Sequence, residues 1–377
     1  MGFWSIALFI LIGIIFYVGW RGQQAFSNFI PSGYGKIYWA VFLLIASSFI
    51  LVERLESGSG SFFSEGLKWV GAYSVAFLFY AFLILVVIDI LILLDRWRGF
   101  IPQVIKKSPA NIGITVICLL VGLLVYGTWN AWNPVFSHYE INISKNTNGP
   151  QSLHAIMISD LHLGTIVNNE RLTEVVNQIN QQEPDLVFLV GDVIDEDIAP
   201  FLEHNMTLTL SGLRPRLGTY MVLGNHDGHG KEVVPYLEAA GVTVLNDQYA
   251  LIDSSFYLIG RGNRGHQNTN ASRLELDDLM AGVDKKLPIV LLDHNPSDLE
   301  EARVNGVDVQ LSGHTHQGQM FPNNLITGSM YELDWGYLRK DTLQVVVSTG
   351  FGTWGPPIRI GNTPEVVDLT INFNLPR

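Results

Sequence analysis

Residues 153–164 read LHAIMISDLHLG, an apolar run that leads into an aspartate and a histidine. A short apolar run bounded by polar residues predicts a buried strand. The same pattern returns at residues 186–192 (LVFLVGD), and residues 169–182 between the two runs carry apolar side chains at helical spacing. Strands that alternate with helices predict an α/β fold.

Five apolar runs in this part of the chain each end in side chains that can bind metals. The clusters are Asp160-Leu161-His162, Gly191-Asp192, Gly224-Asn225-His226-Asp227, Asp293-His294 and Gly313-His314-Thr315-His316. Taken alone, an Asp-x-His is mostly a surface or capping feature, and a lone buried histidine is more often part of a core. Functional residues collect at the carboxyl ends of strands in α/β sheets, so we expect the five clusters to meet at one edge.

The residue types in these clusters indicate the chemistry. Carboxylate, amide and imidazole ligands suit Mn²⁺, Fe or Zn²⁺, and more of them are present than one tetrahedral ion needs. Two neighbouring ions can be served when one carboxylate bridges them. Glycine stands before three of the clusters and allows the backbone to turn sharply and approach the ions closely.

The order D-x-H, G-D, G-N-H-D, H and G-H-x-H resembles the calcineurin-like metallophosphoesterase superfamily. The segments around these motifs resemble the membrane-associated branch of that superfamily, over roughly residues 153–370. They are ISDLHLG, PDLVFLVGDVID, VLGNHD, LLDHNP and LSGHTH. The resemblance implies a four-layer αββα sandwich in residues 151–377. Gln317 departs from the pattern, because that branch often has glycine after G-H-T-H.

The resemblance also implies roles for individual residues. Two divalent ions (Mn, Fe or Zn) would be held by Asp160, His162 and His316 at the first position, by Asp192 as the bridge, and by Asn225, His294 and His314 at the second. A hydroxide shared by the ions would attack phosphorus in line. His226 would protonate the leaving group as general acid, with Asp227 orienting its ring.

Several polar residues near the motifs have less specific patterns. Arg261 and Arg264 lie in GRGNRG, and Arg359 lies in GPPIRIG. The sequence leaves open whether these arginines contact a substrate phosphate or are solvated loop charges. Asn246 is better explained by a turn at a strand end than by a place in the cleft. Asp195 lies near a motif and is not predicted to be a ligand.

The first 133 residues differ from the rest in charge and polarity. They hold eight Lys/Arg and five Asp/Glu, a net charge of +3, whereas the remainder carries −15 and all ten histidines. A membrane span needs roughly 20 apolar residues. Four apolar stretches predict an all-α transmembrane region of four helices, at about 3–20, 35–52, 69–94 and 112–132. Residues 134–150 are predicted to be a polar connector.

Charge predicts the orientation of these spans. The loops at 21–36 and 95–111 share one side of a four-span arrangement and hold six Lys/Arg, so we expect that side to be cytoplasmic. The catalytic domain of this multi-pass cell-membrane protein would then be extracytoplasmic. Asp89, inside the third stretch, is interpreted as a carboxylate that reaches the interface or an arginine.

The sequence therefore predicts a membrane-anchored hydrolase with two metal ions, either a phosphodiesterase or a phosphatase. Four spans exceed what a tether needs, which favours a lipid-linked or envelope phosphoester as substrate. The acidic second half argues against a nucleic-acid partner.

A non-catalytic membrane scaffold or sensor that keeps the fold is the alternative function, but Asp192, Asn225 and His226 are all present. A transporter ranks last, because Asp89 is the only charge within the spans. The metal, the choice between monoester and diester, and the oligomeric state remain open.

Overall fold

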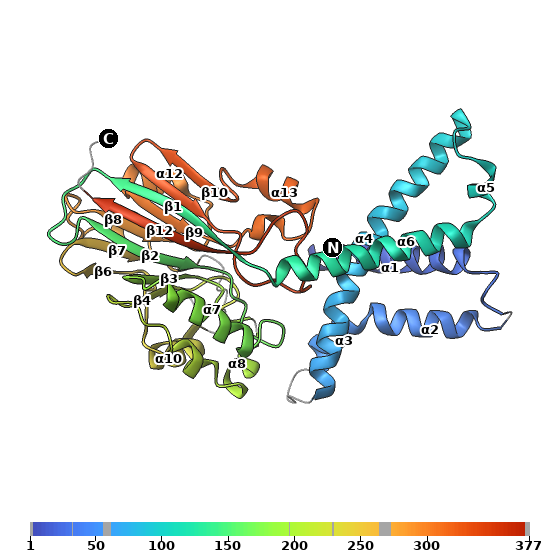
Figure 1. Ribbon diagram of the computed structural model, residues 1–377, viewed down its shortest axis with the longest axis horizontal. Helices are drawn as coiled ribbons and strands as arrows, with labels where there is room; N and C mark the ends of the chain where they lie inside the picture. The colour runs from blue at the N-terminus through green and yellow to red at the C-terminus, as the bar shows by residue number, and fades with distance from the viewer. Residues whose placement is uncertain are drawn as a thin grey trace. The chain divides into compact units, whose positions relative to one another are not determined.

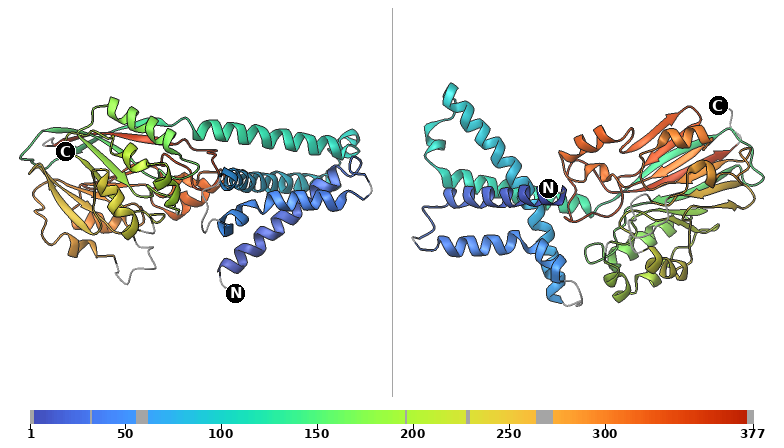
Figure 2. Two further views of the ribbon diagram at one scale, coloured as in Figure 1. Left: turned by 90° about the horizontal axis from the view of Figure 1, so that it is seen from below. Right: turned by 180° about the vertical axis from the view of Figure 1, so that it is seen from behind.

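The computed structural model describes residues 3–31, 33–55, 62–195, 197–227, 230–263 and 273–373. The chain forms two compact units: Met1–Trp129 with Gly355–Ile358, and Asn130–Trp354 with Arg359–Arg377. Figures 1 and 2 show that the first unit is built of helices and the second of two sheets with helices on their outer faces. The second unit corresponds to the catalytic domain expected from the sequence and is called the catalytic unit below.

Three helices of the helical unit are long and apolar enough to cross a membrane. The apolar segments are Leu8–Ala25, Glu65–Arg98 and Pro109–Ala131. They belong to α1 (Phe3–Ala25), α4 (Phe62–Arg98) and α6 (Pro109–Ala131); the other helices are α2 (Gly35–Ala46), α3 (Ser48–Leu55) and α5 (Gln103–Lys106). These segments are candidate spans by length and composition, and they coincide with three of the four stretches expected from the sequence.

The span expected at 35–52 is not one continuous helix. It is divided at Ser47 into α2, with 12 residues, and α3, with 8 residues. At 1.5 Å per residue α2 is about 18 Å long, short of a hydrocarbon core of about 30 Å. The hydroxyls of Ser47 and Ser48 donate to the carbonyls of Leu43 and Ile45, each at 2.6 Å. Such side-chain bonds offer the backbone an alternative to the helix ladder, which explains the break.

Asp89 behaves as interpreted from the sequence. Its carboxylate accepts hydrogen bonds from Arg21 Nη2 and from the hydroxyl of Tyr17, both at 2.6 Å. Arg21 lies near the C-terminal end of α1 and Asp89 near that of α4, so these two ends lie on the same side of the unit. The chain therefore returns between α1 and α4 through the broken pair α2 and α3.

The catalytic unit contains two six-stranded sheets. The first has the order β1-β12-β2-β3-β4-β5, and the second has the order β10-β11-β9-β8-β7-β6. The strands of the first are β1 (Val135–Ile143), β2 (Ser152–Ile158), β3 (Leu186–Val190), β4 (Thr219–Val222), β5 (Val242–Val244) and β12 (Glu365–Phe373). Those of the second are β6 (Gln248–Ile252), β7 (Phe256–Gly260), β8 (Ile289–Leu292), β9 (Val309–Ser312), β10 (Gly336–Lys340) and β11 (Leu343–Val347).

The two sheets pack face to face. Alternate residues of β3 point in opposite directions: Phe188 and Val190 enter the core between the sheets, whereas Val187 and Leu189 enter the core under the helices. The helices over the first sheet are α7 (Asn169–Gln181), α8 (Ala199–Glu203), α9 (Met206–Leu210) and α10 (Gly230–Ala239). Those over the second are α11 (Leu276–Leu279) and α12 (Leu299–Asn305). The expected four-layer αββα sandwich is confirmed.

Residues 134–150 are more than a connector. They include β1, which pairs in parallel with β12 from Val135 opposite Glu365 to Ile143 opposite Phe373. Ile141 and Ile143 are buried between the sheets. The sequence did not predict this strand, because it is not a continuous apolar run. It lies at the edge of the sheet, and the polar residues of its open face alternate with the buried isoleucines. The first strand of the catalytic unit thus precedes the boundary expected at residue 150.

Candidate metal centre

The sequence clusters follow the carboxyl ends of five strands that belong to both sheets. Asp160, Asp192 and His226 come after β2, β3 and β4 of the first sheet, while His294 and His314 come after β8 and β9 of the second. Those strands run in parallel within each sheet. Three groups of side chains with ligand atoms within 4.8 Å of one another result: Asp160, His162, His316; Asp192, His294, His314; and His162, Asp195, His226.

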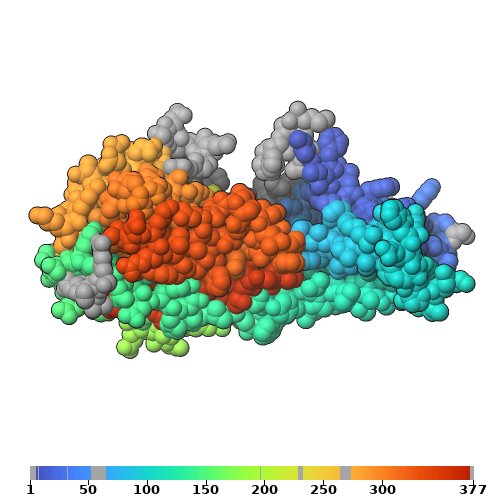
Figure 3. Space-filling model, turned by 90° about the horizontal axis from the view of Figure 1, so that it is seen from above, coloured from blue at the N-terminus to red at the C-terminus, as the bar shows by residue number. Residues whose placement is uncertain are grey.

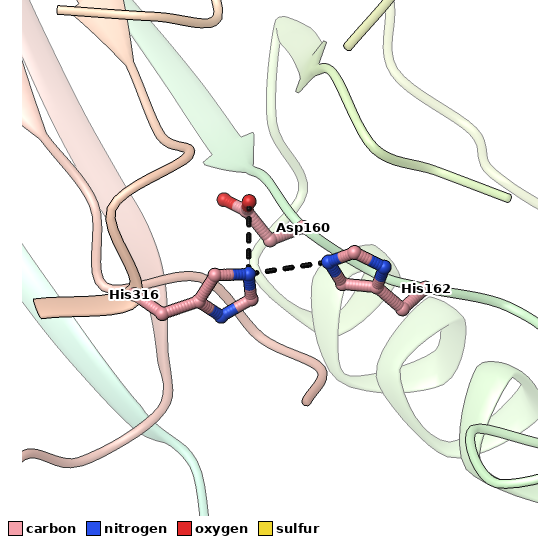
Figure 4. Close-up of side chains that lie close together, drawn as sticks. All are labelled: Asp160, His162 and His316. Carbon is pink, nitrogen blue, oxygen red and sulfur yellow. Dashed lines mark hydrogen bonds and ion pairs between the residues drawn. The ribbon is translucent and has the colours of Figure 1, made fainter. Parts of the chain in front are cut away.

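The first group consists of Asp160, His162 and His316, all buried (Figure 4). His316 Nε2 lies 3.2 Å from His162 Nε2 and 3.3 Å from Asp160 Oδ1. Figure 4 shows the three side chains pointing toward one another, Asp160 and His162 from the segment after β2 and His316 from the segment after β9. Two imidazole nitrogens and a carboxylate oxygen that converge without solvent form a donor set that fits a divalent cation.

The second group consists of Asp192, His294 and His314. His294 Nδ1 donates to the backbone carbonyl of Val190 at 2.8 Å, which leaves Nε2 directed at Asp192 Oδ2, 3.0 Å away. Orientation of a ligating histidine by a hydrogen bond at its other nitrogen is usual in metal sites. The ring of His314 lies 5.2 Å from that of His294, between centroids. This donor set also fits a divalent cation.

Asp192 lies between the two groups. Its Oδ2 is 3.0 Å from His294 Nε2 and 4.0 Å from His162 Nε2. Its Oδ1 accepts the backbone N–H of His226 at 2.7 Å. Asn225 precedes His226 in the same loop and is exposed. The carboxylate is therefore placed where a bridge between two ions would have to be.

Residues 153–318 match the family model of the calcineurin-like phosphoesterases. An uncharacterized metallophosphoesterase from Aquifex aeolicus (strain VF5) is 31% identical over 241 residues, which cover 62% of this chain and 90% of that protein. The chain belongs to the metallophosphoesterase family. The resemblance seen in the sequence is thereby confirmed.

Relatives of this metallophosphoesterase include membrane proteins. A transmembrane protein with metallophosphoesterase domain from Danio rerio is 28% identical over 274 residues, which cover 68% of this chain and 62% of that protein. An uncharacterized metallophosphoesterase from Helicobacter pylori (strain J99 / ATCC 700824) is 29% identical over 225 residues, 59% of this chain and 60% of that protein. The match thus spans about three fifths of each of these two relatives.

Asp227 does not take the position that the family resemblance implied. Its two carboxylate oxygens accept the backbone N–H groups of Ile194 at 2.9 Å and Gly224 at 2.8 Å, so it holds two loops together. The carboxylate near the histidine rings is that of Asp195, whose Oδ1 is 3.6 Å from His162 Nδ1 and 4.0 Å from His226 Nδ1. The sequence analysis did not assign Asp195 to the site. The signal that could have indicated it is the motif GDVID, in which Asp195 follows Asp192 by three residues.

Electrostatics in the second group favour a proton where an ion would bind. Burial lowers the pKa of His294, but the carboxylates of Asp192 and Asp160 outweigh burial and raise the pKa to about 10. Burial raises the pKa of Asp192, and the neighbouring His294 outweighs this and lowers it. Burial lowers the pKa of His314 to about 4, so this ring is neutral and ready to bind a metal. A cation at this position would replace the proton of His294.

The backbone is strained at the candidate ligands. Five of them adopt the left-handed region, with φ of 54° at Asp160, 49° at His162, 51° at Asp192, 72° at His314 and 47° at His316. This conformation costs a residue with a side chain about 1–2 kcal/mol. Gln317 has φ of 46° as well, a conformation that glycine would adopt without steric cost.

Two of the three arginines that the sequence left open, Arg261 and Arg359, are buried rather than solvated. Arg359 is fully buried and donates to the carbonyls of Gly350 and Gly352 and to His316 Nδ1, at 3.1, 2.6 and 3.2 Å. Arg261 is 2% exposed and makes two hydrogen bonds to Glu301, at 2.7 and 2.8 Å.

The structure describes one of the two remaining positions, Asn246, and does not describe the other, Arg264. Asn246 is exposed in the turn between β5 and β6, as expected. Arg264 lies outside the described residues.

Proposed function

We propose that this chain is a membrane-anchored phosphoester hydrolase that works with two divalent cations. The observation that carries the proposal is the place of Asp192, whose Oδ2 lies within 4.0 Å of a histidine from each of two ligand groups. Asp160, His162 and His316 would hold one ion and His294, His314 and Asn225 the other, with Asp192 between them. Bound ions would activate water and neutralise the phosphoryl oxygens.

His226 is the candidate general acid. Its backbone N–H is bonded to Asp192, and its ring lies 4.9 Å from that of His162, between centroids, at the boundary of the first ligand group. Nδ1 of His226 faces Asp195, which leaves Nε2 for the leaving-group oxygen. A positioned imidazole with one nitrogen near a carboxylate is suited to donate a proton near neutral pH.

Turnover and metal content of the full-length protein test these roles. After chelation, single metals (Mn²⁺, Fe²⁺ or Zn²⁺) are added back and hydrolysis of bis-p-nitrophenyl phosphate and p-nitrophenyl phosphate is followed. His226→Ala should lower the rate roughly 10²–10⁴-fold with the metal content retained, because it removes only the proton donor. Asp192→Ala should lose both ions and rate. Equal effects of the two variants would contradict this division, and a folded, metal-loaded protein without turnover would favour the scaffold.

A lipid-linked substrate is the second part of the proposal. Helix α13 (Asn323–Met330) lies between His316 and Tyr331, whose ring is 6.3 Å from that of His314. Leu325, Ile326 and Met330 on this helix are 65, 57 and 69% exposed. Figure 3 shows that the C-terminal segments, coloured orange to red, cover one face of the catalytic unit. Exposed apolar side chains beside a site indicate contact with membrane or an apolar ligand.

A charged residue introduced on α13 should affect hydrolysis of lipid substrates and not hydrolysis of soluble ones. Ile326→Glu should slow hydrolysis of a phospholipid in vesicles and leave bis-p-nitrophenyl phosphate turnover unchanged, because the charge opposes membrane contact only. Leu208→Glu is the matched control, since Leu208 is 75% exposed on α9. Equal loss on both substrates, or an equal effect of the control, would contradict a lipid-facing site.

The orientation is also part of the proposal. The C-terminal ends of α1 and α4 lie together through the Arg21–Asp89 pair, so the loops that follow them share a side. Residues 21–36 hold two Lys/Arg and residues 95–111 hold four, and α6 leads from that side to the catalytic unit. The positive-inside rule then places the catalytic unit outside the cytoplasm. Protease cleavage of the catalytic unit in intact cells would agree, and complete protection would contradict it.

A further inference from the structure

The helical unit contains a cavity of about 1040 Å³ between α1, α4 and α6. Pockets for small molecules measure roughly 300–1,000 Å³, so the cavity is slightly larger than the top of this range. All but six of the residues that line it are apolar or glycine. Apolar side chains from all three helices contribute, among them Val18, Ala81, Leu85, Val116 and Leu120.

The helices that line this cavity also contact one another directly, at two places along α6. The hydroxyls of Tyr73 on α4 and Thr128 on α6 are 2.9 Å apart, near the C-terminal end of α6. Near the start of α6, Gly113 packs so closely on α1 that a Cβ there would lie 2.9 Å from the Cβ of Ala25. Figure 1 shows the C-terminal half of α4 diverging from α6, with α5 between their ends. The residues of α4 and α6 that line the cavity lie between Phe77 and Arg96 and between Pro109 and Leu120.

The polar lining residues gather at one end of the cavity. They come from the C-terminal turns of α1 and α4, from α2 and from α5: Arg21, Gln24, Tyr38, Asp95, Arg96 and Lys106. Arg21 pairs with Asp89 at 2.6 Å, and Lys106 pairs with Asp95. Arg96 is exposed and makes no hydrogen bond or ion pair within the part of the chain that the structure describes. One positive charge is thus left over at this end.

We propose that the cavity binds one molecule of an anionic phospholipid. Its acyl chains occupy the apolar part, and its phosphodiester, with a single negative charge, pairs with Arg96 beside Lys106. Basic pockets between membrane helices recognise anionic head groups in this way. The residual charge matches that of the phosphodiester, and the bilayer around α1, α4 and α6 supplies the ligand. The site is independent of the phosphoester hydrolase proposed above.

Native mass spectrometry of the delipidated full-length protein tests the proposal. The probes are dioleoylphosphatidylglycerol and dioleoylphosphatidylcholine, which have the same chains and differ in net charge. We expect one tightly bound phosphatidylglycerol per chain and weaker binding of phosphatidylcholine. Arg96→Gln should weaken phosphatidylglycerol binding about fivefold and leave phosphatidylcholine unaffected. Arg98→Gln is the matched control, because Arg98 ends the same helix and does not line the cavity.

The apolar part is tested with Val116→Trp, which places a larger side chain in the cavity and should weaken both lipids. Equal binding of the two lipids to the wild type, or equal effects of Arg96→Gln and Arg98→Gln, would overturn the head-group assignment and with it the proposal. A folded Val116→Trp protein with wild-type lipid binding would overturn the location. A measured mass of a lipid-free dimer would also overturn the proposal, because a second copy of the chain would then fill the cavity. If Val116→Trp does not fold, the pair of arginine variants still decides.

Discussion

Replacing Gly224 by alanine tests whether the site depends on the position of Asp192. A Cβ on Gly224 would lie 2.1 Å from Asp192 Oδ1 and 2.3 Å from the backbone nitrogen of Asp192. Non-bonded heavy atoms are best separated by about 3.5–4.0 Å, so one of the two segments must move by roughly 1 Å. Moving the backbone of Asp192 would cost free energy, because Asp192 lies two residues after the buried strand β3. The carboxylate would therefore leave its place between the two ligand groups.

The size of the effect follows from this displacement. A misplacement of about 1 Å can lower turnover about 10²-fold, which corresponds to about 2.7 kcal/mol in the activation barrier. We expect Gly224→Ala to lose that much turnover of bis-p-nitrophenyl phosphate and to lose bound metal, measured by plasma mass spectrometry. Gly164→Ala is the control, since a Cβ there meets only Asp195 at ordinary contact distances of 3.5 Å and more. A Gly224→Ala protein with two ions and wild-type turnover would refute the reasoning.

Two further predictions concern strain and protons. Gln317→Gly should raise the free energy of unfolding by up to about 1 kcal/mol in urea titrations, because glycine adopts the left-handed conformation of this position without steric cost; a loss of stability would contradict this. Metal binding should strengthen as the pH rises, because the raised pKa of His294 means that a proton must leave Nε2 before an ion can bind. Calorimetry at about pH 6 and about pH 8 checks this, and equal affinities would contradict it.

The fold and the set of candidate ligands could be predicted because both depend on local patterns. Buried strands of parallel sheets are nearly continuous apolar runs, such as residues 186–190, and their carboxyl ends meet at one edge. Convergence of Asp160 and Asp192 therefore follows from strand order, whereas His314 follows β9 of the second sheet and reaches them only because the two sheets pack face to face, so the expectation of a single sheet edge was incomplete. The strand β1 could not be predicted in this way, because half of its residues are polar and its pairing partner lies more than 200 residues away.

What the sequence could not give is the direction of each side chain. Asp195 and Asp227 are both acidic residues next to motifs, and only the backbone of their loops decides which one faces a histidine ring and which one holds backbone amides. Arg359 could not be placed either, because its guanidinium is buried by contacts with carbonyls at positions 350 and 352. The break at Ser47 depends on hydroxyl bonds that composition does not reveal.

The strained ligand positions explain why the site is built between two sheets rather than on one loop. Each residue in the left-handed region costs about 1–2 kcal/mol, and such strain persists only where the surrounding structure fixes it. Asp160 and Asp192 follow strands of one sheet, and His314 and His316 follow a strand of the other. The apolar core that joins the sheets, to which Phe188 and Leu292 belong, therefore fixes the spacing of the donors before any ion binds. In the proposed hydrolase, preorganisation of this kind would let the binding energy of the cations serve catalysis instead of assembling the site.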